Sequence, residues 1–63
     1  MNLQRSHQRE PLLKVSEAAE RCRLSERQMW RHIASGHLPV VRLGRAVRIR
    51  PIDLDRFIDR EVT

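Results

Sequence analysis

The sequence predicts a mostly α-helical domain with a small β-hairpin, in the order helix, helix, hairpin, helix. Apolar residues recur at helical spacing in three segments, and two runs rich in β-branched residues flank Gly44 between the second and third of them. A chain of 63 residues has room for a single domain. We expect residues 1–11, which are polar and end in a proline, to form a flexible N-terminal arm. Residues 12–63 are expected to form the domain.

The positive charge of the chain is concentrated in one block. The formal net charge is +5, but residues 21–50 alone carry eight arginines against the single Glu26. Concentrated positive charge attracts polyanions, and arginine suits bidentate contacts with phosphate and with guanine. The alternative is a basic face that is merely solvated.

The first helix is predicted to begin at Ser16, which can cap it, with Glu17 in the first turn. A short strand is expected just before it, within residues 12–15. One face of the helix carries small and apolar residues at i, i+3, i+4 and i+7, namely Val15, Ala18, Ala19 and Cys22. We expect this face, including Cys22, to lie in the core.

The second helix has the clearest local signals. Ser25 and Gln28 form a capping box, Met29 continues a buried face, and Gly36 ends the helix, so it should span about residues 26–35. Only a few residues separate it from the first helix, and such a tightly connected pair is a helix-turn-helix.

A hairpin and a third helix complete the domain. Residues 40–43 and 46–50 flank Gly44 and Arg45 as two strands around a turn, although the sequence leaves open which side chains point inward. Pro51 suits the first turn of the third helix. The apolar stripe of this helix consists of Leu54, Phe57 and Ile58.

An ordered set of short motifs covers about residues 12–58. The motifs are Glu17-Ala18-Ala19, Leu24-Ser25, Trp30-Arg31, Gly36-His37-Leu38-Pro39, Gly44-Arg45, Arg48-Ile49 and Asp53-Leu54-Asp55-Arg56-Phe57. No single motif is distinctive, but the set in this order resembles the small excisionase-type DNA-binding domains, relatives of the MerR-like winged helix-turn-helix.

The resemblance implies a protein that binds double-stranded DNA, with the second helix in the major groove and the hairpin, or wing, at the adjacent minor groove. Excisionases are recombination directionality factors. They bind several sites cooperatively beside copies of themselves, bend the DNA, and bias a tyrosine integrase towards excising a mobile element. Other members of similar size are small phage-type transcriptional regulators, which is the alternative function.

Two residues depart from the pattern of the resembled family. Many members have glycine in the inter-helix turn, where this chain has Arg23, so either Arg23 adopts an unfavourable backbone conformation or the turn differs locally. Many members have a basic residue after the capping serine, where this chain has Glu26. Glu26 either accepts from a cytosine amino group or stabilises the helix start.

The candidate DNA-binding residues of the second helix lie near its N-terminus, where recognition helices meet base edges. They are Ser25, Arg27, Gln28, Trp30 and Arg31. Arg27 is expected to read guanine and Arg31 to bind phosphate. Gln28 either reads adenine or serves only the capping box. Trp30 lies either against the sugar-phosphate backbone or partly buried against the wing.

The candidate residues of the wing are Arg42, Gly44, Arg45 and Arg48. Gly44 permits a tight turn, and a guanidinium suits a narrow, strongly negative minor groove. Arg45, at the tip, is the strongest candidate for that contact. Arg50, at the base, is instead expected to pair with Asp53 or Asp55.

Other classes of function have little support in the sequence. No nucleophile–base set, P-loop or glycine-rich dinucleotide motif is present, so neither an enzyme nor a cofactor is expected. The spacing of Cys22, His32 and His37, with His7 upstream, matches no standard zinc pattern, and no metal is predicted. No apolar run approaches the roughly 18 residues of a membrane span. We therefore expect a cytoplasmic protein of a bacterial cell or mobile element, without a membrane partner.

Two further alternatives are an adapter that binds an acidic protein and an RNA-binding module. The grouping of arginines on both a recognition helix and a wing disfavours the adapter. RNA readers more often expose stacking aromatic residues, and Trp30 and Phe57 are the only aromatic residues here apart from histidine.

Overall fold

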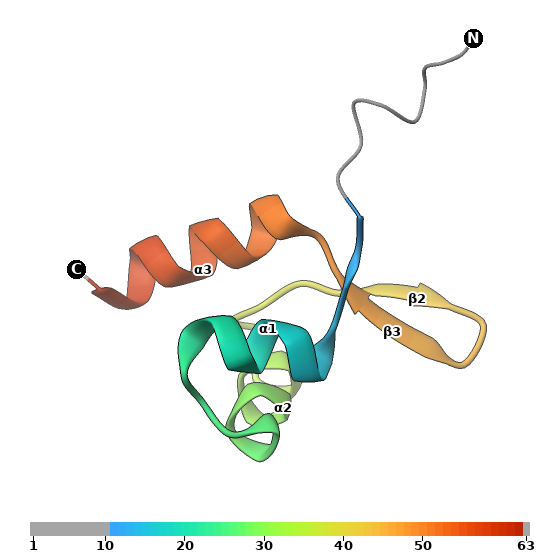
Figure 1. The fold of residues 1–63 in the computed structure, drawn as a ribbon, viewed down its shortest axis with the longest axis horizontal. Coiled ribbons are helices and arrows are strands. Elements are labelled where there is room, and N and C mark those ends of the chain that lie inside the picture. Colours follow the sequence, from blue (N-terminus) through green and yellow to red (C-terminus); the bar gives the residue numbers. More distant parts are fainter. Residues whose placement is uncertain (1–10, 63) are drawn as a thin grey trace, which may run out of the picture.

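The computed structural model describes residues 11–62 and confirms the predicted fold class of three helices with a small antiparallel hairpin. Residues 1–10 of the predicted arm, with Arg5, His7 and Arg9, lie outside the described residues. Figure 1 shows the hairpin extending away from the helices. The elements are β1 (Leu13–Lys14), α1 (Val15–Cys22), α2 (Glu26–Ala34), β2 (Val41–Leu43), β3 (Ala46–Ile49) and α3 (Pro51–Val62).

The hairpin belongs to a three-stranded antiparallel sheet of order β1-β3-β2. Leu13 pairs with Ile49 and Lys14 with Arg48, so the short strand expected before the first helix is present and lies beside β3. The register settles which hairpin residues point inward. Ile49 is fully buried and Val47 packs against the core, whereas Leu43, near the tip, remains 54% exposed.

The turn of the hairpin requires its glycine. Gly44 has a φ of +62°, whereas Arg45 does not have a positive φ. A two-residue loop with a positive φ only at its first central residue is typical of a type II′ turn, which matches the twist of the flanking strands. Gly44 therefore directs β3 back alongside β2 and leaves Arg45 at the tip.

One small apolar core joins all the helices to the sheet. Met29 of α2, Ile49 of β3 and Leu54 of α3 have at most 1% of their surface exposed. Ala18 and Ala19 of α1 are also buried, and their small side chains let α2 pack closely against α1. The buried residues are Leu13, Val15, Ala18, Ala19, Met29, Leu38, Ile49, Leu54 and Phe57.

The start of α1 differs from the prediction. Ser16 is not the cap, because the helix begins at Val15 and the capping position falls on Lys14. The backbone of Lys14 is still extended as the end of β1, and the Glu17 carboxylate accepts its N–H at 2.7 Å. A lysine side chain has no acceptor, so only this half of a capping box exists. Ser16 lies exposed in the first helical turn.

The turn between α1 and α2 is closed by a residue in the left-handed conformation. Arg23 has φ 58° and ψ 36°, so it adopts the conformation that glycine would favour. The N–H of Arg23 donates to the carbonyl of Glu20 at 3.1 Å, and that of Leu24 donates to Ala19 at 2.9 Å. These two bonds form a Schellman motif, which ends α1 and turns the chain into α2.

Both predicted ends of α2 are present. Ser25 Oγ accepts from the N–H of Gln28 at 3.1 Å, and Gln28 Oε1 accepts from the N–H of Ser25 at 2.9 Å. At the other end, Gly36 has a φ of +82°, and His37 N–H donates to the His32 carbonyl at 3.0 Å. The helix ends at Ala34, one residue before the predicted end, because Ser35 is the C-cap.

The end of α2 packs against α3. The rings of His32 and Phe57 meet edge to face with centroids 4.9 Å apart, and Nδ1 of His32 lies 3.4 Å from Nδ1 of His37. Arg50 pairs with Asp53 rather than Asp55, with Nη1 and Oδ2 3.7 Å apart. Because the Arg50 side chain is 60% exposed, this pair contributes little to stability.

We predict that Arg23→Gly raises the free energy of unfolding by about 1 kcal/mol. A non-glycine residue in the left-handed region costs roughly 1–2 kcal/mol, and the greater freedom of glycine in the unfolded chain offsets part of that gain. The melting temperature of so small a domain should then rise by about 4–8 °C in a circular dichroism melt.

The matched control is Gly36→Ala, which introduces a side chain at a positive φ with no atom within 4 Å of the added Cβ. It should lower stability by a similar amount. An Arg23→Gly variant that melts at or below the parental temperature would contradict the assignment of strain to Arg23.

Candidate nucleic-acid interface

The exposed face of α2 carries the predicted recognition residues. Arg27, Trp30, Arg31 and Ala34 are all exposed and follow the i, i+3, i+4, i+7 spacing of one helical face. Met29 is on the other side, in the core. Two arginines and a tryptophan are therefore presented together, with the small Ala34 at the C-terminal end of the face.

Ser25 and Gln28 are placed differently from the arginines. The Gln28 amide oxygen accepts from the N–H of Ser25, which holds the amide at the helix start and leaves one oxygen lone pair and the amide nitrogen for a base. A bidentate contact with adenine uses both the oxygen and the nitrogen of the amide. The geometry therefore favours the capping role for Gln28. Ser25 Oγ is likewise engaged in the cap.

The wing distributes its arginines over two faces. Arg42 is opposite Val47 and Arg48 is opposite Val41, and successive residues along a strand point to opposite faces of the sheet. Arg42 and Arg48 therefore project from opposite faces of the hairpin, with Arg45 in the turn between the strands. A wing inserted into a groove would present a guanidinium to each wall and one at its tip.

A hollow of about 280 Å³ lies between α2 and the wing. Trp30 lines it from α2 and is 40% exposed, so much of its surface remains in solvent. Three cationic side chains and a single carboxylate, that of Glu26, line this hollow. The full lining is Lys14, Val15, Ser16, Glu26, Trp30, Arg45, Ala46, Val47 and Arg48.

Lys14 and Ser16 were not predicted as site residues. Lys14 reaches the hollow because β1 pairs with β3, a contact between segments more than 30 residues apart. Ser16 reaches it because α1 begins one residue earlier than expected, which leaves the hydroxyl exposed in the first turn. A lysine directly before the first helical residue was the only sequence signal, and it is weak by itself.

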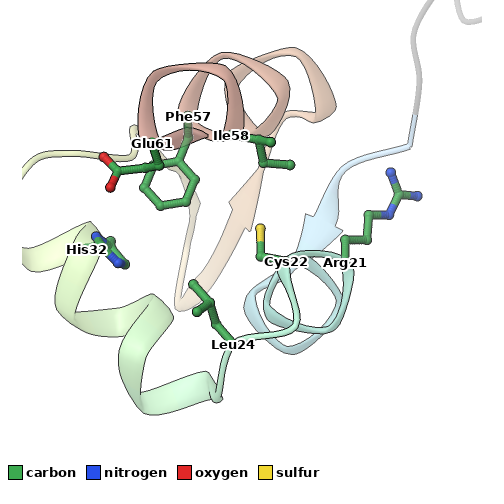
Figure 2. Close-up of a pocket in the computed structure, with 7 residues that line it drawn as sticks. All are labelled: Arg21, Cys22, Leu24, His32, Phe57, Ile58 and Glu61. Atoms are coloured by element: carbon green, nitrogen blue, oxygen red, sulfur yellow. The ribbon is translucent and has the colours of Figure 1, made fainter. Parts of the chain in front are cut away.

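A second hollow, of about 330 Å³, lies between α1 and α3 (Figure 2). Cys22, Leu24, Phe57 and Ile58 point into it, and His32 borders it from α2. Cys22 was expected in the core, but it is only partly buried and packs against the edge of the core. Burial raises the pKa of the Cys22 thiol, which favours its protonated form at neutral pH. In residues 11–62, no group of three or more His, Cys, Asp or Glu side chains could hold a metal ion.

A helix-turn-helix followed by a hairpin, with an arginine-bearing helix and wing around one hollow, is a winged helix-turn-helix module. A family model described as a helix-turn-helix domain matches residues 12–62. The chain belongs to this family, and membership indicates DNA binding. No curated protein and no solved structure shows a significant match to the chain. Among the described residues, none of the helices has the length and apolarity needed to traverse a bilayer.

We predict that Gln28→Ala lowers the free energy of unfolding by about 1 kcal/mol, because the N–H of Ser25 loses its acceptor. Gln28→Glu is the matched variant, since glutamate completes a capping box as well as glutamine does. It should keep the parental stability in chemical unfolding.

The same pair of variants tests the base-reading role of Gln28. Selection of binding sites from a random duplex pool should yield the same preferred sequence for Gln28→Glu as for the parent. A preference that loses adenine at one position would show that the amide nitrogen reads a base.

Proposed function

We propose that this protein is a sequence-specific DNA-binding accessory factor of the excisionase type, which helps a tyrosine integrase to excise a mobile element. The observation that carries the DNA-binding part is the shared hollow. Trp30 of α2 and Arg45 and Arg48 of the wing line the same cavity, so helix and wing can engage one duplex together.

In the proposed complex, α2 enters the major groove and the wing reaches the adjacent minor groove. A helix of nine residues is about 13 Å long, similar to the roughly 12 Å width of the groove. Arg27 lies one turn closer to the start of α2 than Arg31 does. Arg27 is therefore assigned to a guanine edge and Arg31 to a phosphate, with Arg45 in the minor groove.

The excisionase assignment is supported by the motif resemblance and by the charge of α3. Asp55, Asp59 and Glu61 are exposed on this helix, whereas the N-terminal residues Arg5 and Arg9 are basic. Opposite charges on α3 and in the N-terminal segment allow copies on adjacent sites to contact one another head to tail, a contact that does not close on itself. Several adjacent copies would supply the selectivity and DNA bending that one small module lacks.

The class of ligand is tested by titrating the protein with duplex DNA, duplex RNA and single strands of one sequence at fixed salt. Duplex DNA should bind at least tenfold more tightly than the others. Equal or tighter binding of duplex RNA would replace the proposal with an RNA-binding function. Binding to none of them would leave the adapter as the better hypothesis.

Arg31→Ala should weaken binding to all duplexes equally and reduce the slope of log affinity against log salt by about one, because one phosphate contact is lost. Arg27→Ala is the matched variant on the same face of α2. It should instead relax the preference at one or two base pairs, each by about 1–3 kcal/mol. An exchange of these two phenotypes would reverse the assigned roles.

We expect cooperative loading on an array of sites. The protein should sediment as a monomer without DNA, and gel shifts on two or more adjacent sites should show tighter binding than on one. Deleting residues 1–10 should reduce this cooperativity without changing the melting temperature. Independent filling of adjacent sites, or a stable dimer in solution, would contradict the head-to-tail arrangement.

The excision role is separated from transcriptional control by adding the protein to a tyrosine integrase and its attachment-site DNA. The integrase encoded beside this gene is the one to use. Excision that depends on the protein supports the proposal, and promoter regulation without such dependence supports the transcriptional regulator.

A further inference from the structure

Lys14 and Arg48 form a like-charged pair that the helix and wing contacts proposed above do not explain. They are directly opposite each other in the β1–β3 register, so their side chains leave the same face of the sheet at neighbouring positions. Like charges in directly opposed positions destabilise a sheet. Within residues 11–62, no carboxylate forms an ion pair with Lys14, Arg45 or Arg48.

Both residues border the hollow between α2 and the wing. The Arg48 guanidinium donates through Nη1 to the Val47 carbonyl at 2.9 Å, which holds it against its own strand. Its other N–H groups can still donate to a ligand. The exposed hydroxyl of Ser16 and the Arg45 side chain border the same space, and Glu26 is the one carboxylate there. The hollow thus has donors and an excess of positive charge.

The same hollow also has an apolar lining. Trp30, Ala46 and Val47 line the hollow with apolar surface, and the indole is 40% exposed. Cationic and aromatic residues around one hollow match a phosphate with its attached deoxyribose better than they match an isolated anion.

We propose that Lys14 and Arg48 together bind one phosphate of the DNA backbone, the phosphate located between the segment read by α2 and the segment reached by the wing. This inference rests on the proposed DNA binding. Phosphate oxygens would accept from Lys14 Nζ and from the Arg48 guanidinium, and the negative charge would remove the repulsion between the two cations. Such a contact fixes the register of the protein on the duplex and carries no base preference.

The test uses duplexes of one sequence, each with a single uncharged methylphosphonate at a different backbone position. The parent, Lys14→Gln, Arg48→Gln and the double variant are titrated with every duplex. Each single variant should bind the unmodified duplex about tenfold more weakly, as expected for loss of a charge-assisted contact. One methylphosphonate position should weaken the parent by a similar factor. The sensitivity at that position should be reduced in both single variants and abolished in the double variant.

Two control variants separate this contact from a general loss of charge. Arg56→Gln removes one positive charge from the exposed surface of α3 and should retain the full sensitivity at that position. Lys14→Arg keeps the charge in the hollow and should also retain it. In the absence of DNA and at low salt, Lys14→Gln should melt at or above the parental temperature, because the cross-strand repulsion is relieved.

The inference is overturned if the parent binds DNA but the double variant keeps the parental sensitivity at every modified position. It is also overturned if Lys14→Gln melts clearly below the parent. If the parent binds no duplex at all, the proposed function itself fails, and the phosphate site fails with it.

Discussion

The position of the recognition helix relative to the wing depends on one small apolar core. Met29 fixes α2 in this core and Ile49 fixes β3, and neither side chain has any exposed surface. Deleting methylene groups from such a site costs about 2–5 kcal/mol, which is a large share of the stability of a domain this small. The orientation of α2 relative to the hairpin therefore depends on the residues that fill this core.

The turns between the elements set the directions of α2 and the hairpin around that core. The Schellman turn at Arg23 and the capping box at Ser25 leave only three residues between α1 and α2, so the recognition helix has little freedom to rotate. Gly36 ends α2 and directs the chain towards the hairpin. The turn at Gly44 sets the direction of β3. Two left-handed glycines and one left-handed arginine thus define the path of the chain. The packing of α1 on α2 offsets the cost of the strained backbone at Arg23.

Local signals predicted most of the fold, and long-range contacts account for what was missed. The capping box at Ser25, the stop at Gly36 and the apolar stripe of α3 depend on residues close in sequence, and each is present. The predicted start of α1 was wrong because β1 pairs with β3 and its extended end places the cap at Lys14. The register of the hairpin and the hollow beside Trp30 depend on the same pairing, which no spacing rule shows. The DNA contacts of the site residues remain predictions.

The central claim is that the core holds the exposed face of α2 and the wing together as one surface that binds duplex DNA. Amide chemical-shift mapping by NMR during a titration with a short duplex tests it most directly. We predict that the largest chemical-shift changes fall on the amides of Arg27, Arg31, Gly44 and Arg45. The amides of Phe57 and Ile58, which line the hollow between α1 and α3, should change little. Changes centred on α3, or changes on α2 with none on the wing, would contradict the account.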